Sequence, residues 1–149
     1  MLFRPPLCEQ NRGVQVQALA DKSSLSGIRR AIRVQLQDAE ASPSQSFDCL
    51  VAVTEACTNA LLHGRGAGDA RDPEVEWEIT HACARFLIRD FAPHERAKSK
   101  TTPKDKEKRD GGYGLKMMRQ LMDEVDIKFS PTGTTVALVK YFETQAARS

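Results

Sequence analysis

A carboxylate, a carboxamide and an imidazole recur at four-residue steps in one stretch of the chain, at Glu55, Asn59 and His63. Residues at this spacing lie on one face of an α-helix, one turn apart. A carboxylate can accept a proton from an attacking hydroxyl group, and an amide oxygen suits Mg²⁺ that is held mainly by phosphates. The spacing lets Glu55 and Asn59 serve one substrate, although the pair also fits the boundary of an ordinary amphipathic helix.

A second candidate site is the glycine-rich run Gly111-Gly112-Tyr113-Gly114-Leu115. Small residues at the start of a helix let backbone N–H groups approach a phosphate at the positive end of the helix. Lys116 and Arg119 would add positive charge nearby. A flexible entry into a packed helix is the alternative explanation of the glycines, but the basic segment that precedes them favours phosphate binding.

That basic segment, from Ala92 to Asp110, has almost no apolar residues and cannot contribute to a core. Its cationic side chains are Arg96, Lys98, Lys100, Lys104, Lys106, Lys108 and Arg109. We predict a mobile lid over about residues 92–110 that closes over a nucleotide and brings cations near its outer phosphates. A solvated charged loop is the alternative.

Asp90 is expected at the end of a strand, where its carboxylate could accept a hydrogen bond from an adenine amino group. Thr134 and Thr135, which follow Gly133, could back the same pocket with their hydroxyl groups. Structural explanations also exist, because aspartate is common at turns and threonine is common in strands.

Several chemistries find no support in the sequence. It contains no Gly-x-x-x-x-Gly-Lys-Ser/Thr phosphate loop, and no His-Arg-Asp or Asp-Phe-Gly motif of a eukaryotic-type kinase. The histidines lack the spacing of a zinc site, so a metal held only by protein groups is not expected. The formal net charge of +2 gives no general electrostatic case for a nucleic-acid or membrane partner.

The length of 149 residues suits one domain, which can bury a core without disulfides or metals. The cysteines lack paired metal-ligand spacing and are expected to be reduced, mostly buried thiols; they are Cys8, Cys49, Cys57 and Cys83. No apolar stretch approaches the roughly 20 residues of a membrane span, and the first ten residues resemble no export signal. We therefore expect a cytoplasmic protein with a single domain over residues 1–149.

Hydrophobic periodicity predicts the elements that position these residues. Strands are expected over residues 14–20, 75–80, 85–91, 126–129 and 134–141, with a hairpin between the second and third and a tight turn at 130–133. One helix should bury Leu25, Ile28, Ile32 and Leu36. A last helix, opened by the glycines, should bury Leu115, Met118, Leu121, Met122 and Val125.

The helix that carries Glu55 has the clearest start signal. Ser42-Pro43-Ser44-Gln45 indicates an N-cap, a proline at the first helical position and a glutamine that completes a capping box. Gly64 is the expected stop. The order of strand, helix, helix, two strands, loop, helix and two strands favours an α/β two-layer sandwich, with a mixed sheet and helices on one face.

With these motifs in this order, the chain resembles the GHKL superfamily of ATP-binding proteins, and within it the bacterial anti-sigma-factor serine kinases. Residues 55–63 resemble the N-box, residues 112–115 the glycine box, and residues 133–136 the final box. The likeness spans roughly residues 12–142. It implies the Bergerat-type ATP-binding fold, with ATP and Mg²⁺ as cofactors.

The resemblance also implies a role for each site residue. Asn59 would ligate Mg²⁺, Glu55 would act as general base towards a serine hydroxyl on a partner protein, and Asp90 would recognise adenine. The remaining residues expected at the nucleotide are His63, Ala92, Gly112, Tyr113, Gly114, Leu115, Thr134 and Thr135.

One segment departs from the family pattern. The family usually has Asp-x-Gly-x-Gly after the strand, whereas this chain has Asp90-Phe91-Ala92-Pro93-His94. The Cβ of Ala92 and the ring of Pro93 take space that the backbone normally leaves to adenine. Nucleotide affinity is therefore expected to be weak or altered.

The leading hypothesis is an ATP-dependent serine/threonine protein kinase and anti-sigma-type regulator of a partner-switching pathway. It would bind a sigma factor or comparable regulator and phosphorylate an anti-anti-sigma-type antagonist on serine; a homodimer is expected from the resemblance alone. One alternative is a binding module of the same fold that sequesters its partner without phosphoryl transfer. Another is the detached ATPase domain of a sensor kinase, which would phosphorylate histidine on another chain.

Overall fold

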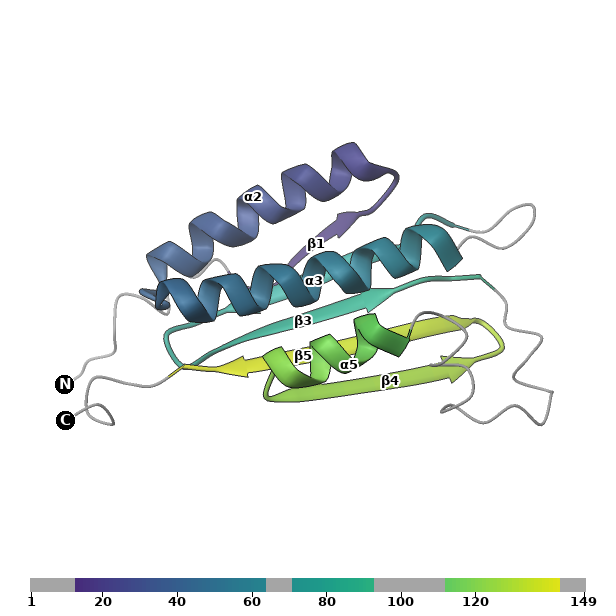
Figure 1. The fold of residues 1–149 in the computed structure, drawn as a ribbon. Helices are drawn as coiled ribbons and strands as arrows, with labels where there is room; N and C mark the ends of the chain where they lie inside the picture. The colour runs from purple at the N-terminus through teal and green to yellow at the C-terminus, as the bar shows by residue number, and fades with distance from the viewer. Residues whose placement is uncertain (1–12, 64–70, 93–111, 143–149) are drawn as a thin grey trace.

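The computed structural model describes residues 13–63, 71–92 and 112–142. Figure 1 shows two layers, a sheet and a set of helices that cover one of its faces. The elements are β1 Gln15–Ala18, α2 Lys22–Asp38, α3 Pro43–His63, β2 Glu74–Ile79, β3 Cys83–Arg89, α5 Gly112–Leu121, β4 Glu124–Ser130 and β5 Gly133–Tyr141. The predicted α/β two-layer sandwich is confirmed.

The sheet differs from the prediction in one respect. Within the described residues it has five strands in the order β1-β2-β3-β5-β4, and every neighbouring pair is antiparallel. The expected mixed sheet is therefore wrong. The strands β3 and β4, which precede and follow α5 in the chain, do run in the same direction. They are not neighbours, however, because β5 lies between them and pairs with both.

Helix α2 begins at Lys22, and Asp21 caps it. The Asp21 side chain accepts a hydrogen bond from the backbone N–H of Ser24, with 2.8 Å between the atoms, and so satisfies one donor of the first turn. The predicted buried stripe is confirmed; it comprises Leu25, Ile28, Ile32 and Leu36. These side chains belong to the core cluster.

The capping box of α3 is confirmed in both directions. The backbone N–H of Gln45 donates to the Ser42 hydroxyl at 3.1 Å, and the backbone N–H of Ser42 donates to the Gln45 side-chain oxygen at 2.9 Å. The helix begins at Pro43 and ends at His63. The expected stop at Gly64 lies outside the described residues, and so does the expected lid over about residues 92–110, apart from Ala92.

The last helix is shorter than expected. Helix α5 ends at Leu121, and Asp123 already donates its backbone N–H to Val139 on β5, with an N–O distance of 2.9 Å. Val125 therefore lies on β4 and not in the helix, although it still packs against the core. The period of the side chains changes there from 3.6 residues in the helix to 2 in the strand. Val125 follows Met122 by three residues, a spacing that is also typical of a helix.

The core lies between the helices and the sheet. Its fully buried members include Ile32, Val53, Val75, Ile88 and Leu138. The part of the chain that the structure describes contains no helix long and apolar enough to span a membrane. The hairpin between β2 and β3 and the turn between β4 and β5 occur where they were predicted.

Candidate nucleotide site

The candidate site lies at one end of the sandwich. There, β3 ends, β5 begins, α5 begins and α3 approaches its last turns (Figure 1). The antiparallel pairing of β3 with β5 places the end of β3 beside the start of β5. The motifs predicted from the sequence are thus gathered at one end of the fold. The side chains of His63, Gly112 and Tyr113, and all of Gly111, are not part of the description.

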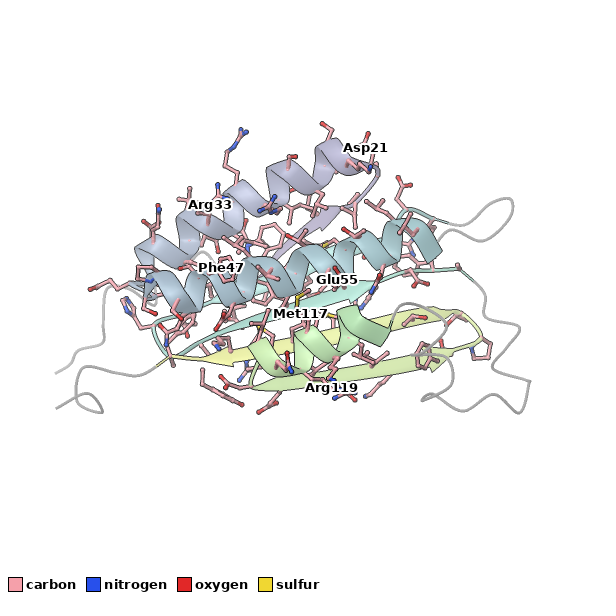
Figure 2. The ribbon with its side chains drawn as sticks, in the orientation of Figure 1. Asp21, Arg33, Phe47, Glu55, Met117 and Arg119 are labelled. Atoms are coloured by element: carbon pink, nitrogen blue, oxygen red, sulfur yellow. The ribbon has the colours of Figure 1, made fainter. Side chains whose placement is uncertain are left out.

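Glu55 and Asn59 lie one turn apart on α3, and both are partly buried. The capping box fixes where this helix begins, and its apolar face, which includes Val53, Ala56, Cys57 and Ala60, turns into the core. Figure 2 labels Glu55 on the side of α3 that faces α5. The two polar side chains therefore lie at the edge of the core.

Gly114, in the first turn of α5, lies against the side chain of Glu55. A Cβ on Gly114 would be 2.8 Å from Cδ and 2.9 Å from Cγ of Glu55, and closer still to Oε1. The two residues are far apart in the sequence. This contact joins the carboxylate of the first candidate motif to the glycine run of the second.

The start of α5 has further features of an anion site. Its first backbone N–H groups have no partner within the helix, and its first turn contains no acidic residue. Lys116 is exposed one turn into the helix. Arg119 lies instead in the last turn and donates to the backbone oxygen of Val125 at 3.2 Å, so the expectation that it adds charge near the glycines is wrong.

Asp90 continues the register of β3 past its last residue. Its backbone N–H donates to the carbonyl oxygen of Thr134 at 2.9 Å. Its Oδ1 accepts hydrogen bonds from the backbone N–H groups of Ala92 and Thr134, each at 3.2 Å. These bonds fix the carboxyl group on the side of the sheet that carries the helices.

Ala92 is almost fully buried, with 1% of its surface exposed, yet it lies outside the main core cluster. Among the described residues, the only residue other than glycine with a positive φ is Glu40. The backbone at position 92 therefore accepts an alanine without strain. Pro93 and His94 lie outside the described residues.

Three other predicted nucleotide residues, Thr134, Thr135 and Leu115, are described by the structure. Thr134 lies beside Asp90, whereas Thr135 pairs with Arg89 and points to the opposite face of the sheet. The two hydroxyl groups therefore do not back one pocket from the same side. The side chain of Leu115 is 7% exposed and belongs to the core, so its backbone is the part available to a ligand.

Sequence reasoning missed the role of Gly133 at this site. Its φ is +149°, and a Cβ on it would meet the main chain of Asp90 and Phe91. The sequence placed Gly133 in a tight turn and at the start of the segment that resembles the final box, but it did not indicate this contact. No signal in a single sequence reveals a contact between two strands that depends on their register.

The described cysteines are free, and none contributes to the site. Burial raises the pKa of the Cys57 thiol from 9.0 to about 12. Burial likewise raises the pKa of Cys49 to about 12, against an opposing effect of Lys140. Across residues 13–63, 71–92 and 112–142, no cluster of three or more His, Cys, Asp or Glu side chains could hold a metal ion.

Residues 18–140 match the family described as the histidine kinase-like ATPase domain. The chain is 28% identical over 145 residues to proteins named serine-protein kinase RsbW from Staphylococcus aureus, including that of strain MRSA252, and the match covers 91% of each chain. These relatives are similar to this chain over nearly their whole length.

Two solved structures share the fold. One contains the RsbU and RsbW domains of Rv1364c from Mycobacterium tuberculosis, with a TM-score of 0.64 and 21% identity; 87% of this chain matches 32% of that longer chain. The other is the SiaB-SiaC complex from Pseudomonas aeruginosa, with a TM-score of 0.60, 15% identity, and coverage of 88% and 91%. At these identities the likeness concerns the fold alone.

Proposed function

Because this chain belongs to the family of the histidine kinase-like ATPase domain, we propose that it is an ATP-dependent serine/threonine protein kinase and anti-sigma-type regulator. It binds a sigma factor or comparable regulator, and it phosphorylates an anti-anti-sigma-type antagonist on serine. The observation that carries the proposal is the contact between Glu55 and Gly114, because it joins a proton acceptor to the start of a helix suited to phosphate.

ATP and Mg²⁺ are the cofactors of this proposal. The amide oxygen of Asn59 fits Mg²⁺ that takes its other ligands mainly from phosphates and water. When bound, Mg²⁺ would neutralise charge on the phosphates. Asn59 lies one turn from Glu55 on the same helix, so a base and a metal ligand are available to one substrate.

The proposed reaction needs little from the protein beyond position and charge. Glu55 accepts the proton of the serine hydroxyl as its oxygen attacks the γ-phosphorus. The bond between that phosphorus and the β–γ bridging oxygen breaks, and ADP leaves. The backbone N–H groups at the start of α5 donate to the phosphate oxygens, where they stabilise negative charge.

Base recognition falls to Asp90 in this proposal. Its carboxyl group is held by the N–H groups of Ala92 and Thr134, and it accepts a hydrogen bond from the amino group of adenine. The likeness to proteins named serine-protein kinase supports a serine acceptor. A homodimer remains an expectation from the family resemblance.

The test is transfer of label from γ-labelled Mg-ATP to purified candidate antagonists, namely the anti-anti-sigma-type proteins of the same genome. The expected result is label on a serine that disappears with Glu55→Gln. Binding of Mg-ATP is measured separately by titration calorimetry. If ATP binds but no candidate is labelled, or if Glu55→Gln transfers as well as the parent, the kinase proposal is contradicted.

The buried side chain of Ala92 favours one second candidate, a binding module that sequesters its partner without phosphoryl transfer. Absence of heat at millimolar Mg-ATP, together with retained binding of a partner, would support that module. Label that is lost in acid would instead support histidine transfer, because phosphohistidine is acid-labile and phosphoserine is not.

A further inference from the structure

Gly114 has a neighbour that its place in a glycine run does not suggest. The three heavy atoms nearest to a Cβ at this position all belong to the side chain of Glu55. We propose that Gly114 is a positioning residue, whose missing side chain provides the space that the Glu55 carboxyl group occupies. This inference rests on the proposed kinase function, since it concerns the residue assigned there as the base.

The space at Gly114 lies between two helices that are anchored elsewhere. Helix α3 is fixed at its start by the capping box and by the ion pair between Asp48 and Lys140, with 3.0 Å between the atoms. Helix α5 is fixed by Leu115 and Met118, which are buried in the core. A methyl group at position 114 therefore cannot be accommodated by separating the helices, and the Glu55 side chain must move instead.

The chemistry requires this position to be accurate. A general base must come within about 3 Å of the proton that it accepts, and a displacement of about 1 Å can lower a rate roughly 100-fold. The start of α5 also attracts a carboxylate, because its free N–H groups carry partial positive charge. Gly114 thus lets Glu55 approach a positive helix end where the reacting phosphate is proposed to lie.

The substitution Gly114→Ala separates this role from a structural one. The φ of Gly114 lies outside the left-handed region, so alanine fits the backbone. The atoms in the way are Cγ, Cδ and Oε1 of the Glu55 side chain, which can turn away by rotation about its own bonds. Because alanine also favours helix over glycine, the variant should fold and melt no lower than the parent, with Glu55 displaced.

Gly27 offers a matched control. It lies inside α2, and a Cβ there would have nothing within 4 Å. Gly27→Ala should therefore leave both transfer and nucleotide affinity unchanged. The substrate for these measurements is the antagonist that the parent protein labels in the kinase assay. With it, Gly114→Ala should lower kcat roughly 100-fold, while the Kd for Mg-ATP stays within about threefold of the parent value.

A double-mutant cycle with Glu55→Gln isolates the contact. If Gly114 acts through Glu55, then Gly114→Ala causes no further loss in the Glu55→Gln background. Two results overturn the proposal: losses that multiply in the double variant, or a Kd for Mg-ATP that rises in proportion to the loss of kcat. The second result would assign Gly114 to the nucleotide itself.

Crystal structures keep this inference separate from the kinase proposal. If the parent transfers no label, the kinase proposal fails. The inference about Gly114 is then tested by comparing the position of the Glu55 side chain in the parent and in Gly114→Ala. The expected pair of structures has the carboxyl group against Gly114 in the parent and turned away in Gly114→Ala, with α3 and α5 unmoved. A parent crystal in which Glu55 points away from Gly114 overturns the inference.

Discussion

The main chain of Asp90 and the Cα of Gly133 are in close contact where β3 ends and β5 begins. A Cβ on Gly133 would be 2.9 Å from the carbonyl carbon of Asp90 and closer still to its oxygen. The φ of +149° at Gly133 also disfavours any side chain. The aspartate proposed to recognise adenine is therefore held by a glycine on the neighbouring strand.

Gly133→Ala should be strongly destabilising, because the obstructing atoms are backbone and cannot rotate away. We expect a loss of about 2–4 kcal/mol in the free energy of unfolding in urea. Gly13→Ala is the control, since Gly13 has a φ of +65° but nothing within 4 Å of a Cβ; strain alone should cost about 1–2 kcal/mol there. Equal losses in the two variants would contradict the proposed contact.

Asp90→Asn and Asp90→Ala should differ in stability and agree in function. Asparagine keeps an oxygen for the N–H groups of Ala92 and Thr134, so its unfolding free energy should stay within about 1 kcal/mol of the parent, whereas alanine leaves both donors without that acceptor and should cost about 1–3 kcal/mol. Both should weaken Mg-ATP binding at least roughly tenfold in calorimetry, since each loses the charged acceptor. Unchanged affinity in both variants would remove Asp90 from the proposed site.

Ala92→Gly tests the departure from the family pattern. Removing the buried methyl group should tighten Mg-ATP binding, by roughly threefold to tenfold if that group crowds the base. The cost in unfolding free energy should be about 1 kcal/mol, from lost burial and greater freedom of the unfolded chain. Weaker ATP binding by the glycine variant would show that Ala92 contributes to the site.

The local parts of this fold could be predicted from the sequence, because each depends on neighbours in the chain. The capping box at Ser42, the apolar stripe of α2 and the turn at Pro131 all follow from residues a few positions apart. The motifs also pointed to a GHKL protein, which the family match confirms.

The long-range parts could not be predicted in this way. The position of β5 between β3 and β4 depends on tertiary pairing, which element order alone does not determine. The contact between Glu55 and Gly114 likewise depends on how α3 and α5 pack. The register of β5, which separates Thr134 from Thr135, follows from its pairing with β3. The sequence thus named the candidate site residues but not their neighbours in the fold.

Lys140 should be a strong stability determinant away from the site. Its ammonium group donates to Asp48 at 3.0 Å and to the carbonyl oxygen of Leu121, at the end of α5, at 2.7 Å. Because both groups of the pair are largely buried, Lys140→Ala should cost about 2–4 kcal/mol in urea unfolding. The control is Lys128→Ala, which removes an exposed pair with Asp126 and should cost less than about 0.5 kcal/mol.

Because the thiols of Cys49 and Cys57 are buried, we expect the free energy of unfolding to fall at alkaline pH. Burial raises the pKa of each from 9.0 to about 12. Below pH 9 both states of the protein hold these protons, so the thiols cause no pH dependence. Between pH 9 and 12 the unfolded chain releases a proton that the folded chain keeps, and unfolding becomes easier by about 1.4 kcal/mol per pH unit for each thiol.

Urea unfolding at pH 8 and pH 10 measures this slope, and matched variants assign it. Cys57→Ala should unfold more easily at pH 8, because it loses buried volume, but it should show a smaller fall in stability towards pH 10. Val53→Ala is the control, since Val53 is fully buried and has no ionisable side chain, and the fall in its stability towards pH 10 should equal that of the parent. If the fall between pH 8 and pH 10 is the same in the parent and in Cys57→Ala, ionisation of this thiol does not cause it.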